Sequence, residues 1–295
     1  MKRTAEIRCG RRTIEISNPD KVLWPDAGIT KLDLATYYAR VAEYMFPHVK
    51  DRPMNLHNFP QGVAGKGFFL QDIPEHFPDW IARVTVPKRG GTVTHAVAKE
   101  PATLPYLAGQ NCITPHLWSS RVDMLDRPDH MVVDLDPSGG PFGEIRAAAR
   151  AAGDLLRAKG LDPFAMTTGS RGIHVLVPLR RTADYDRVRA FARGLAEELV
   201  DEHPNRLTLE HRIENRGDRI YVDVLRNAKV HTVAAPYATR PKPGAPVATP
   251  LHWDELRDRH LAPDRWSIKT LFKRLDAIGG DPWADLRRHA RALPR

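Results

Sequence analysis

Apolar side chains recur at helical spacing in three stretches of the chain. Residues 31–48 show the pattern directly after Thr30, whose hydroxyl suits a helix N-cap, and Pro47 predicts where this helix ends. The two other stretches are residues 144–160, which end on the helix-terminating Gly160, and residues 183–204. The pattern therefore predicts three long amphipathic helices.

Shorter apolar runs between turn residues predict strands. Two of them lie at residues 81–86 and 92–97 and are joined by a turn at Gly90 and Gly91. Others lie at residues 131–136 and at both ends of the stretch 164–179. Residues 218–227 alternate apolar and polar side chains, as a half-buried strand does. A short helix is expected at residues 102–108, and a helical pair at residues 266–278 and 283–292.

The order of these elements predicts the fold class. Strands and helices interleave without the regular βαβ period of a doubly wound fold. Neither GxGxxG nor GxxxxGK[ST] occurs, which excludes dinucleotide-binding and P-loop sites. We therefore expect a mixed α+β fold. Residues 235–250 are rich in Pro and Ala, and by composition alone they would be a linker.

Composition and charge restrict the class of protein. The chain has 295 residues, 42% of them hydrophobic, and no apolar run long enough to span a membrane. Its first residues lack the apolar core of a secretory signal, and Cys9 and Cys112 cannot make a four-cysteine zinc site, so we expect a cytoplasmic protein with reduced thiols. The net charge of +9 favours a polyanionic partner such as nucleic acid, but an arginine-rich protein from a GC-rich genome explains it equally well.

Two carboxylates end an apolar strand in the stretch HMVVDLDPSGG, residues 130–140. Side chains alternate between the faces of a strand, so Asp134 and Asp136 point the same way. Two such carboxylates repel unless a cation lies between them, and hard divalent ions such as Mg²⁺ or Mn²⁺ take oxygen ligands. The alternative is a solvated strand end whose acids cap the next turn.

Two other stretches carry further candidate chemistry. In TTGSRGIHV, residues 167–175, the hydroxyls, the glycines and Arg171 suit a turn that cradles phosphate oxygens, while His174 is either an anion donor or a structural histidine. Asp223 lies between two valines, where an unpaired charge is costly. It either pairs with Arg226 or Arg219, or it is the third carboxylate of a two-metal site for phosphoryl transfer.

Together these motifs resemble the polymerase domain of bacterial ligase D, a branch of the archaeo-eukaryotic primase superfamily. The resemblance runs from NPDKVLWP at residues 18–25 to GAPVATPLHWDEL at residues 244–256. It implies a bipartite α+β fold in one catalytic domain, residues 1–295, with DNA-end contacts in about residues 1–125 and the metal and nucleotide site in residues 126–295. It also implies divalent metal, typically Mn²⁺ but also Mg²⁺.

The resemblance assigns roles to individual residues. It implies that the metal ligands are Asp134, Asp136 and Asp223. The residues that it directs at the incoming nucleotide are Ser170, Arg171, His174, Arg240 and His116, so that residues 235–250 become a site loop. A pocket for a 5′-phosphate on the downstream strand is made by Asn18, Lys21 and Lys31. Phe68 and Phe69 are the pair that packs against the template.

The chain departs from the family pattern at two places. Gln71 and Asp72 follow the Phe-Phe pair where a basic residue is common, and His57 and Asn58 stand where basic residues are usual. These departures leave the catalytic motifs intact, but they put template or end-bridging contacts in doubt. No ligase or phosphoesterase domain is present, so we expect a stand-alone version of this module.

The resemblance implies a template-directed nucleotidyltransferase, a polymerase or primase that adds ribonucleotides in preference to deoxyribonucleotides at DNA gaps or 3′ ends during repair such as end joining. The expected substrates are gapped or end-containing DNA with a 5′-phosphate and nucleoside triphosphates. The expected protein partners are a separate ligase and a Ku-type end-binding protein. The expected location is the bacterial cytoplasm near the nucleoid, with no membrane partner. Two alternatives are a metal-dependent nuclease, which would not need the triphosphate residues, and a non-catalytic DNA-end-binding protein, which would not need the three acids.

Overall fold

The computed structural model describes residues 3–294 and divides the chain into two compact units. The first unit contains the residues up to Trp118 together with Thr232–Val247 and Trp266–Ile278. The second contains Ser119–His231, Ala248–Arg265 and the residues from Gly279 onward. Each unit is thus built from segments that are far apart in the sequence.

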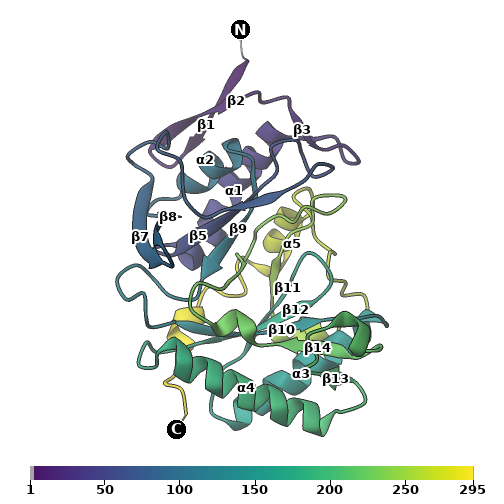
Figure 1. Cartoon of the computed structure of the whole chain (residues 1–295). Helices are drawn as coiled ribbons and strands as arrows, with labels where there is room; N and C mark the ends of the chain where they lie inside the picture. Colours follow the sequence, from purple (N-terminus) through teal and green to yellow (C-terminus); the bar gives the residue numbers. More distant parts are fainter. Residues whose placement is uncertain (1–2, 295) are drawn as a thin grey trace. The chain divides into compact units, whose positions relative to one another are not determined.

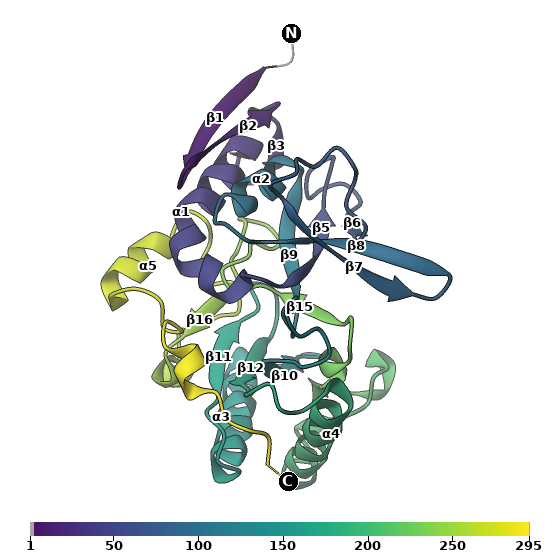
Figure 2. The same ribbon diagram turned by 90° about the vertical axis from the view of Figure 1, so that its left-hand side faces the viewer.

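The first unit is built on an antiparallel sheet in the order β15-β9-β5-β8-β7, with β6 paired to β5. Its strands are β5 (Pro53–Asn58), β6 (Phe68–Leu70), β7 (Ala82–Lys88), β8 (Gly91–Val97), β9 (Cys112–Trp118) and β15 (Thr232–Ala234). Figure 2 shows β7 and β8 as a long two-stranded ribbon. Two smaller strand pairs are β1 (Thr4–Cys9) with β2 (Arg12–Ser17), and β3 (Val22–Trp24) with β4 (Ile29–Thr30). The helices are α1 (Lys31–Val49), α2 (Thr103–Gly109) and α5 (Leu271–Ile278).

Helix α1 begins where the sequence predicts and ends later than predicted. Thr30 is its N-cap and forms a capping box with Asp33, in which each side chain accepts a hydrogen bond from the other residue's backbone N–H. Pro47 does not end the helix, because it lies in the last turn, and Lys50 still donates its backbone N–H to Phe46.

The second unit carries a six-stranded sheet in the order β13-β14-β10-β12-β11-β16. Strands β10, β12 and β14 of this sheet are labelled in Figure 1. All neighbouring strands are antiparallel except β13 and β14. The strands are β10 (His130–Asp136), β11 (Phe164–Thr167), β12 (Ile173–Pro178), β13 (Leu207–Thr208), β14 (Ile220–Asp223) and β16 (Thr249–Leu251). The longer helices are α3 (Phe142–Ala158) and α4 (Tyr185–Glu202), and the short 3₁₀ helices are η1 (Ile213–Asn215), η2 (Leu225–Asn227), η3 (Trp253–Arg257) and η4 (Leu286–His289).

Strand β10 lies in the middle of this sheet, and its side chains alternate between the apolar core and the opposite face, which carries two acids. Met131, Val133 and Leu135 are fully buried, as the apolar face of a central strand should be. Asp134 and Asp136 project from the opposite face because they occupy the alternate positions. The side-chain period of two therefore gives one strand both a core face and a polar face.

Two sequence predictions are wrong in their extent. The strand predicted at residues 218–227 stops at Asp223, because the Asp223 carboxylate accepts the backbone N–H of Leu225 and turns the chain into η2. The predicted C-terminal helical pair reduces to α5 and the single turn η4. The first of them ends at Ile278 as predicted, before Gly279 and Gly280, which both adopt positive φ, but it begins at Leu271 and not at Trp266.

The Pro- and Ala-rich stretch at residues 235–250 is not a linker. Tyr38 of α1 donates its hydroxyl to the carbonyl of Ile113 at 2.6 Å and accepts the backbone N–H of Thr239 at 3.2 Å. Thr114 donates its hydroxyl to the carbonyl of Thr239 at 2.6 Å. These buried hydrogen bonds fix the backbone next to Arg240 within the first unit.

The mixed α+β class predicted from the sequence is confirmed. Both cysteines, Cys9 and Cys112, are buried free thiols. Within the part of the chain that the structure describes, every helix is too short or too polar to cross a membrane.

Candidate metal and nucleotide site

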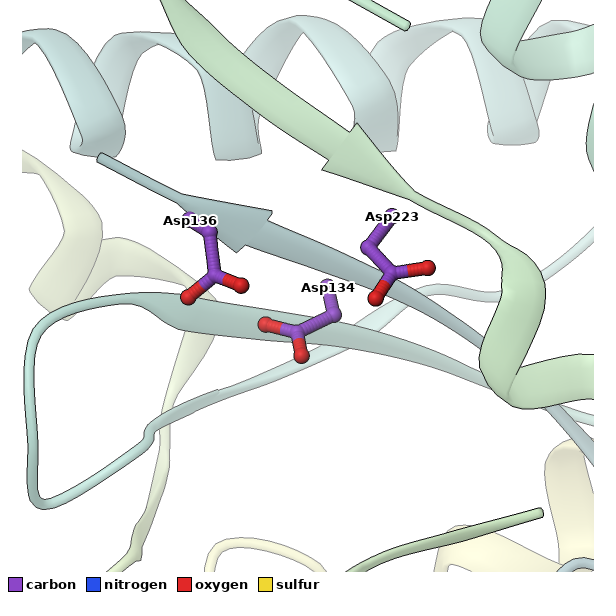
Figure 3. Close-up of side chains that lie close together, drawn as sticks. All are labelled: Asp134, Asp136 and Asp223. Atoms are coloured by element: carbon purple, nitrogen blue, oxygen red, sulfur yellow. The ribbon is translucent and has the colours of Figure 1, made fainter. Parts of the chain in front are cut away.

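Three carboxylates meet on one face of the second unit's sheet (Figure 3). Asp134 and Asp136 are two residues apart on β10, and Asp223 on β14 lies directly opposite Asp134 in the strand register. Each contributes an oxygen, and these oxygens all lie within 4.8 Å of one another. The pairing of two strands thus adds a third acid to the two that the sequence places on one face.

Burial makes this arrangement electrostatically unfavourable on its own. Asp134 and Asp223 are each more than nine-tenths buried. Burial and the charge of Asp134 raise the pKa of Asp136, against the opposing effects of His174 and Arg171. A divalent cation among three carboxylate oxygens would remove this cost, and an all-oxygen ligand set is the one that Mg²⁺ and Mn²⁺ prefer. The three acids therefore fit a divalent metal site.

Asp223 also has the arginine partner that the sequence suggested. Arg226 lies 3.4 Å from its carboxylate, whereas the Arg219 guanidinium donates to the carbonyls of Arg216 and Asn215 instead. Arg226 is substantially exposed and lies in the flanking turn η2. Asp223 therefore belongs both to the acidic cluster and to an ion pair at its edge.

His174 lies next to the three acids. It is directly opposite Asp134 in the pairing of β10 with β12, and its Nε2 is 3.3 Å from an Asp134 oxygen. The other ring nitrogen, Nδ1, is buried and has no hydrogen-bond partner within residues 3–294. An orphaned buried nitrogen is costly, so it marks a position where a ligand could complete the site.

The loop before His174 is closed by its own side chain. The Thr168 hydroxyl accepts the backbone N–H groups of Ser170, Arg171 and Gly172 at 3.3, 3.2 and 3.0 Å. The Thr168 N–H in turn donates to the carbonyl of Gly172 at 3.0 Å. The sequence suggested a turn that cradles phosphate oxygens, but these three amides donate to Thr168. Ser170 itself is partly exposed and Arg171 is exposed.

Thr168→Val should loosen this loop, because it leaves three backbone N–H groups without their acceptor. We expect the free energy of unfolding to fall by about 1–3 kcal/mol, measured by urea denaturation, and nucleotide affinity to fall with it. Thr168→Ser keeps the hydroxyl and is the matched control. Equal stability and nucleotide affinity in the Val and Ser variants would show that the hydroxyl does not hold the loop.

The remaining predicted nucleotide residues belong to the first unit. His116 on β9 lies opposite Asn55 of β5, and its ring meets the edge of Phe69 at 5.1 Å. Arg240 is close enough to His57 to lower the pKa of that histidine. Phe68 and Phe69 are both about half exposed, but they alternate along β6 and therefore point to opposite faces.

The three residues of the expected 5′-phosphate pocket lie together at the start of α1. The backbone N–H of Lys31 donates to the carbonyl of Lys21 at 2.8 Å, and that of Lys21 donates to the carbonyl of Asn18 at 3.1 Å. Lys31 is nearly fully buried, and its ammonium donates to the carbonyl of Gly109 at 3.2 Å. Burial, and then the charge of Lys21, lower the pKa of Lys31.

Comparison with known proteins settles the family. The family model described as the LigD primase-polymerase domain matches residues 30–283. A solved structure, the polymerase domain from Mycobacterium tuberculosis ligase D in complex with DNA, is similar with a TM-score of 0.87 and 31% sequence identity, covering 93% of this chain and 98% of that one. The chain belongs to the LigD primase-polymerase family. It is thus a nucleotidyltransferase of the primase-polymerase type, as the motifs predicted.

Full-length relatives of this family are much longer than the chain. The multifunctional non-homologous end joining protein LigD of Pseudomonas aeruginosa is 32% identical over 291 residues, which are 94% of this chain and 33% of the relative. The bifunctional non-homologous end joining protein LigD of Bacillus subtilis is 29% identical over 287 residues, 95% of this chain and 45% of the relative. The chain therefore spans between a third and a half of these two relatives.

Two features of this LigD primase-polymerase site were not predicted from the sequence. Thr168 was one of several hydroxyls in a turn, although a threonine just before such a turn often bonds the backbone N–H groups that follow it, which could have indicated its role. His57 was noted only because it replaces a basic residue. Its ring contacts depend on strand pairing and have no local sequence signal.

Proposed function

We propose that the chain adds nucleotides, ribonucleotides in preference, to primer 3′ ends at DNA gaps and ends under the direction of a template. The observation that carries this proposal is the cluster of Asp134, Asp136 and Asp223, within a chain of the LigD primase-polymerase family. The acids face an adjacent histidine and a loop that presents a hydroxyl and a guanidinium. Such a set suits a metal-bound triphosphate.

The three carboxylates would hold the divalent ions, Mn²⁺ or Mg²⁺. Metal bound there would offset charge on the triphosphate and the leaving pyrophosphate and lower the pKa of the attacking 3′-hydroxyl. Ser170 and Arg171 would bind triphosphate oxygens, since a hydroxyl and a guanidinium are good hydrogen-bond donors to phosphate. His174 would offer its orphaned Nδ1 for a hydrogen bond to the nucleotide. Within the first unit, Arg240 and His116 are the residues that we propose bind nucleotide.

One assay separates this function from its two alternatives. The protein is incubated with a gapped duplex, Mn²⁺ and labelled nucleotide. Extension of the primer supports the polymerase, shortening supports a metal-dependent nuclease, and a mobility shift without a change in length supports a DNA-end-binding protein. Neither alternative explains why the loop residues accompany the acids.

Ribonucleotides should be added faster than deoxyribonucleotides. This expectation rests on family membership and not on a steric contact in the chain. Single-turnover rates with matched NTP and dNTP on the same gapped duplex provide the measurement. A clear preference for dNTP would remove the ribonucleotide part of the proposal and leave the polymerase part standing.

The proposed biological setting is DNA end joining. The curated relatives are named for non-homologous end joining, and the related solved structure is a complex with DNA. The partners would be gapped or end-containing DNA with a 5′-phosphate, a ligase and a Ku-type end-binding protein, in the bacterial cytoplasm close to the nucleoid. The net charge of +9 suits such a polyanionic partner.

A further inference from the structure

The ring of His57 packs between two phenylalanine rings of the first unit. His57 lies on β5 directly opposite Phe69 of β6. The two rings are nearly parallel, with an interplanar angle of 8° and centroids 4.3 Å apart. This is a face-to-face stack between two planar side chains.

The stack continues inward to the core of the first unit. Phe59 packs on His57 with ring centroids 4.6 Å apart and is itself buried. Gly67, just before β6, lies directly on the Phe59 ring, and a Cβ added there would come within 2.4 Å of that ring. The absence of a side chain at Gly67 therefore lets β6 approach closely enough for Phe69 to reach His57.

Phe69 forms the outer end of this stack. His57 covers one of its faces, and His116 meets it at 84°, across an edge. Half of Phe69 nevertheless remains exposed. A large aromatic ring that is supported on one face and half exposed to solvent is suited to stack a planar ligand such as a nucleobase.

The charge state of His57 suits this supporting role. Burial, and then the nearby positive charge of Arg240, lower its pKa from the ordinary histidine value. The ring is therefore neutral at neutral pH and can pack on Phe69 without burying a charge. A lysine at this position would offer a cation but no plane.

We propose that His57 is a positioning residue that holds Phe69 as a stacking platform for one unpaired template base. This inference deepens the proposed template-directed function and rests on it. The contact to the base is made by Phe69, while His57 acts through Phe69 by fixing the plane of its ring. Stacking is tolerant of base identity, so the platform would serve any template sequence.

The test compares two DNA substrates that differ in one unpaired base. Affinities are measured for a one-nucleotide gap and for a nick with the same downstream 5′-phosphate, without metal or nucleotide. The wild type should prefer the gap. His57→Ala should reduce that preference about fivefold, since base–aromatic stacking contributes substantially to binding of an unpaired base. His57→Lys should reduce the preference by a similar factor. Any attraction of the added lysine for phosphate affects both substrates and therefore cancels in the ratio.

His57→Phe keeps a stacking ring and should retain the preference. His76→Ala, which removes an exposed histidine of the same unit, is the control and should also retain it. Thermal melts identify variants that fail to fold, and the Lys and Phe variants keep the test decisive if His57→Ala is one of them. In steady state, His57→Lys should raise KM for templated addition about fivefold with kcat nearly unchanged.

Equal affinity of the wild type for gap and nick, or an unchanged preference in folded His57→Lys, would overturn the role of His57. These outcomes concern binding in the absence of metal. They are therefore distinct from failure of the proposed function, which would appear as a wild type that does not extend a primer.

Discussion

Asp136→Asn will abolish nucleotide addition and at the same time make the metal-free protein more stable. Loss of one carboxylate from the cluster should slow addition by about a thousandfold or more, since metal sites supply several kcal/mol of transition-state stabilisation. Asp134→Ala and Asp136→Ala should do the same. DNA binding should remain close to that of the wild type, because phosphate contacts on DNA do not depend on these acids.

The gain in stability follows from the sign of the pKa shift. Burial and Asp134 raise the pKa of Asp136, so the folded state disfavours its ionised form relative to the unfolded chain. This cost is present at neutral pH and disappears as the pH falls through the raised folded pKa toward the ordinary value. Asn removes the charge, so its stabilising effect should be seen at pH 7 and lost in acid.

Thermal melts with and without Mn²⁺ provide a readout that is independent of activity. Saturating Mn²⁺ should stabilise the wild type, by about 2.7 kcal/mol at a hundred times Kd, and should not stabilise Asp136→Asn to the same extent. Asp201→Asn changes an exposed acid on α4 and should behave like the wild type throughout. Near wild-type addition by the Asp134 and Asp136 variants, or equal Mn²⁺ stabilisation of Asp136→Asn, would contradict the metal site.

Local patterns predicted the parts of this site that depend on one segment. Alternation alone placed Asp134 and Asp136 on the same face, because the period of a strand is fixed. It could not show that Asp223 lies directly opposite Asp134, because strand register is set by pairing between distant segments. From the residues alone, Asp223 was either an arginine partner or a third carboxylate, and only the family resemblance implied that it is a metal ligand.

The errors also have physical causes. The TTGSRG turn was predicted to cradle phosphate oxygens, but the Thr168 hydroxyl accepts three of its backbone N–H groups, because it is only two to four residues away from them. The first C-terminal helix was predicted to begin at Trp266 but begins at Leu271, because Trp266 and Ile268 form backbone hydrogen bonds with Val247 and Ala245 instead. A local hydrogen bond in the first case, and a contact between distant segments in the second, outweighed the pattern.

Tertiary packing explains why composition wrongly indicated a linker at residues 235–250. A Pro- and Ala-rich stretch has the composition of a linker, yet hydrogen bonds from Tyr38 and Thr114 fix it at Thr239. Their partners are more than a hundred residues away in the sequence. Only the three-dimensional structure shows that the backbone next to Arg240 is held in place.

Gapped DNA with a downstream 5′-phosphate should bind more tightly than its 5′-hydroxyl counterpart, and two lysines should account for the difference. Lys21 and Lys31 lie together at the start of α1 with Asn18 beside them. A terminal phosphate carries more negative charge than an internal phosphodiester. Charge-assisted contacts of about 1.5–3 kcal/mol would make the preference roughly tenfold or more.

The double variant Lys21→Ala with Lys31→Ala should erase this preference without changing binding to blunt duplex. Because Lys31 is buried and bonds Gly109, Lys31→Met with Lys21→Ala keeps the apolar stem and guards against misfolding. Lys66→Ala, an exposed lysine of the same unit, should leave the ratio of the two affinities unchanged. Titrations at one moderate salt concentration are required, because phosphate contacts depend on ionic strength.

The pKa of Lys31 should also report the phosphate directly. In the free protein, burial lowers that pKa, and the nearby positive charge of Lys21 lowers it further. A phosphate dianion bound between the two lysines favours the charged form, so the Lys31 pKa should rise on binding. NMR titration of the lysine side-chain resonances with a 5′-phosphorylated and a 5′-hydroxyl gapped duplex measures this shift. A Lys31 pKa that responds equally to both substrates would show that the pocket does not recognise the terminal phosphate.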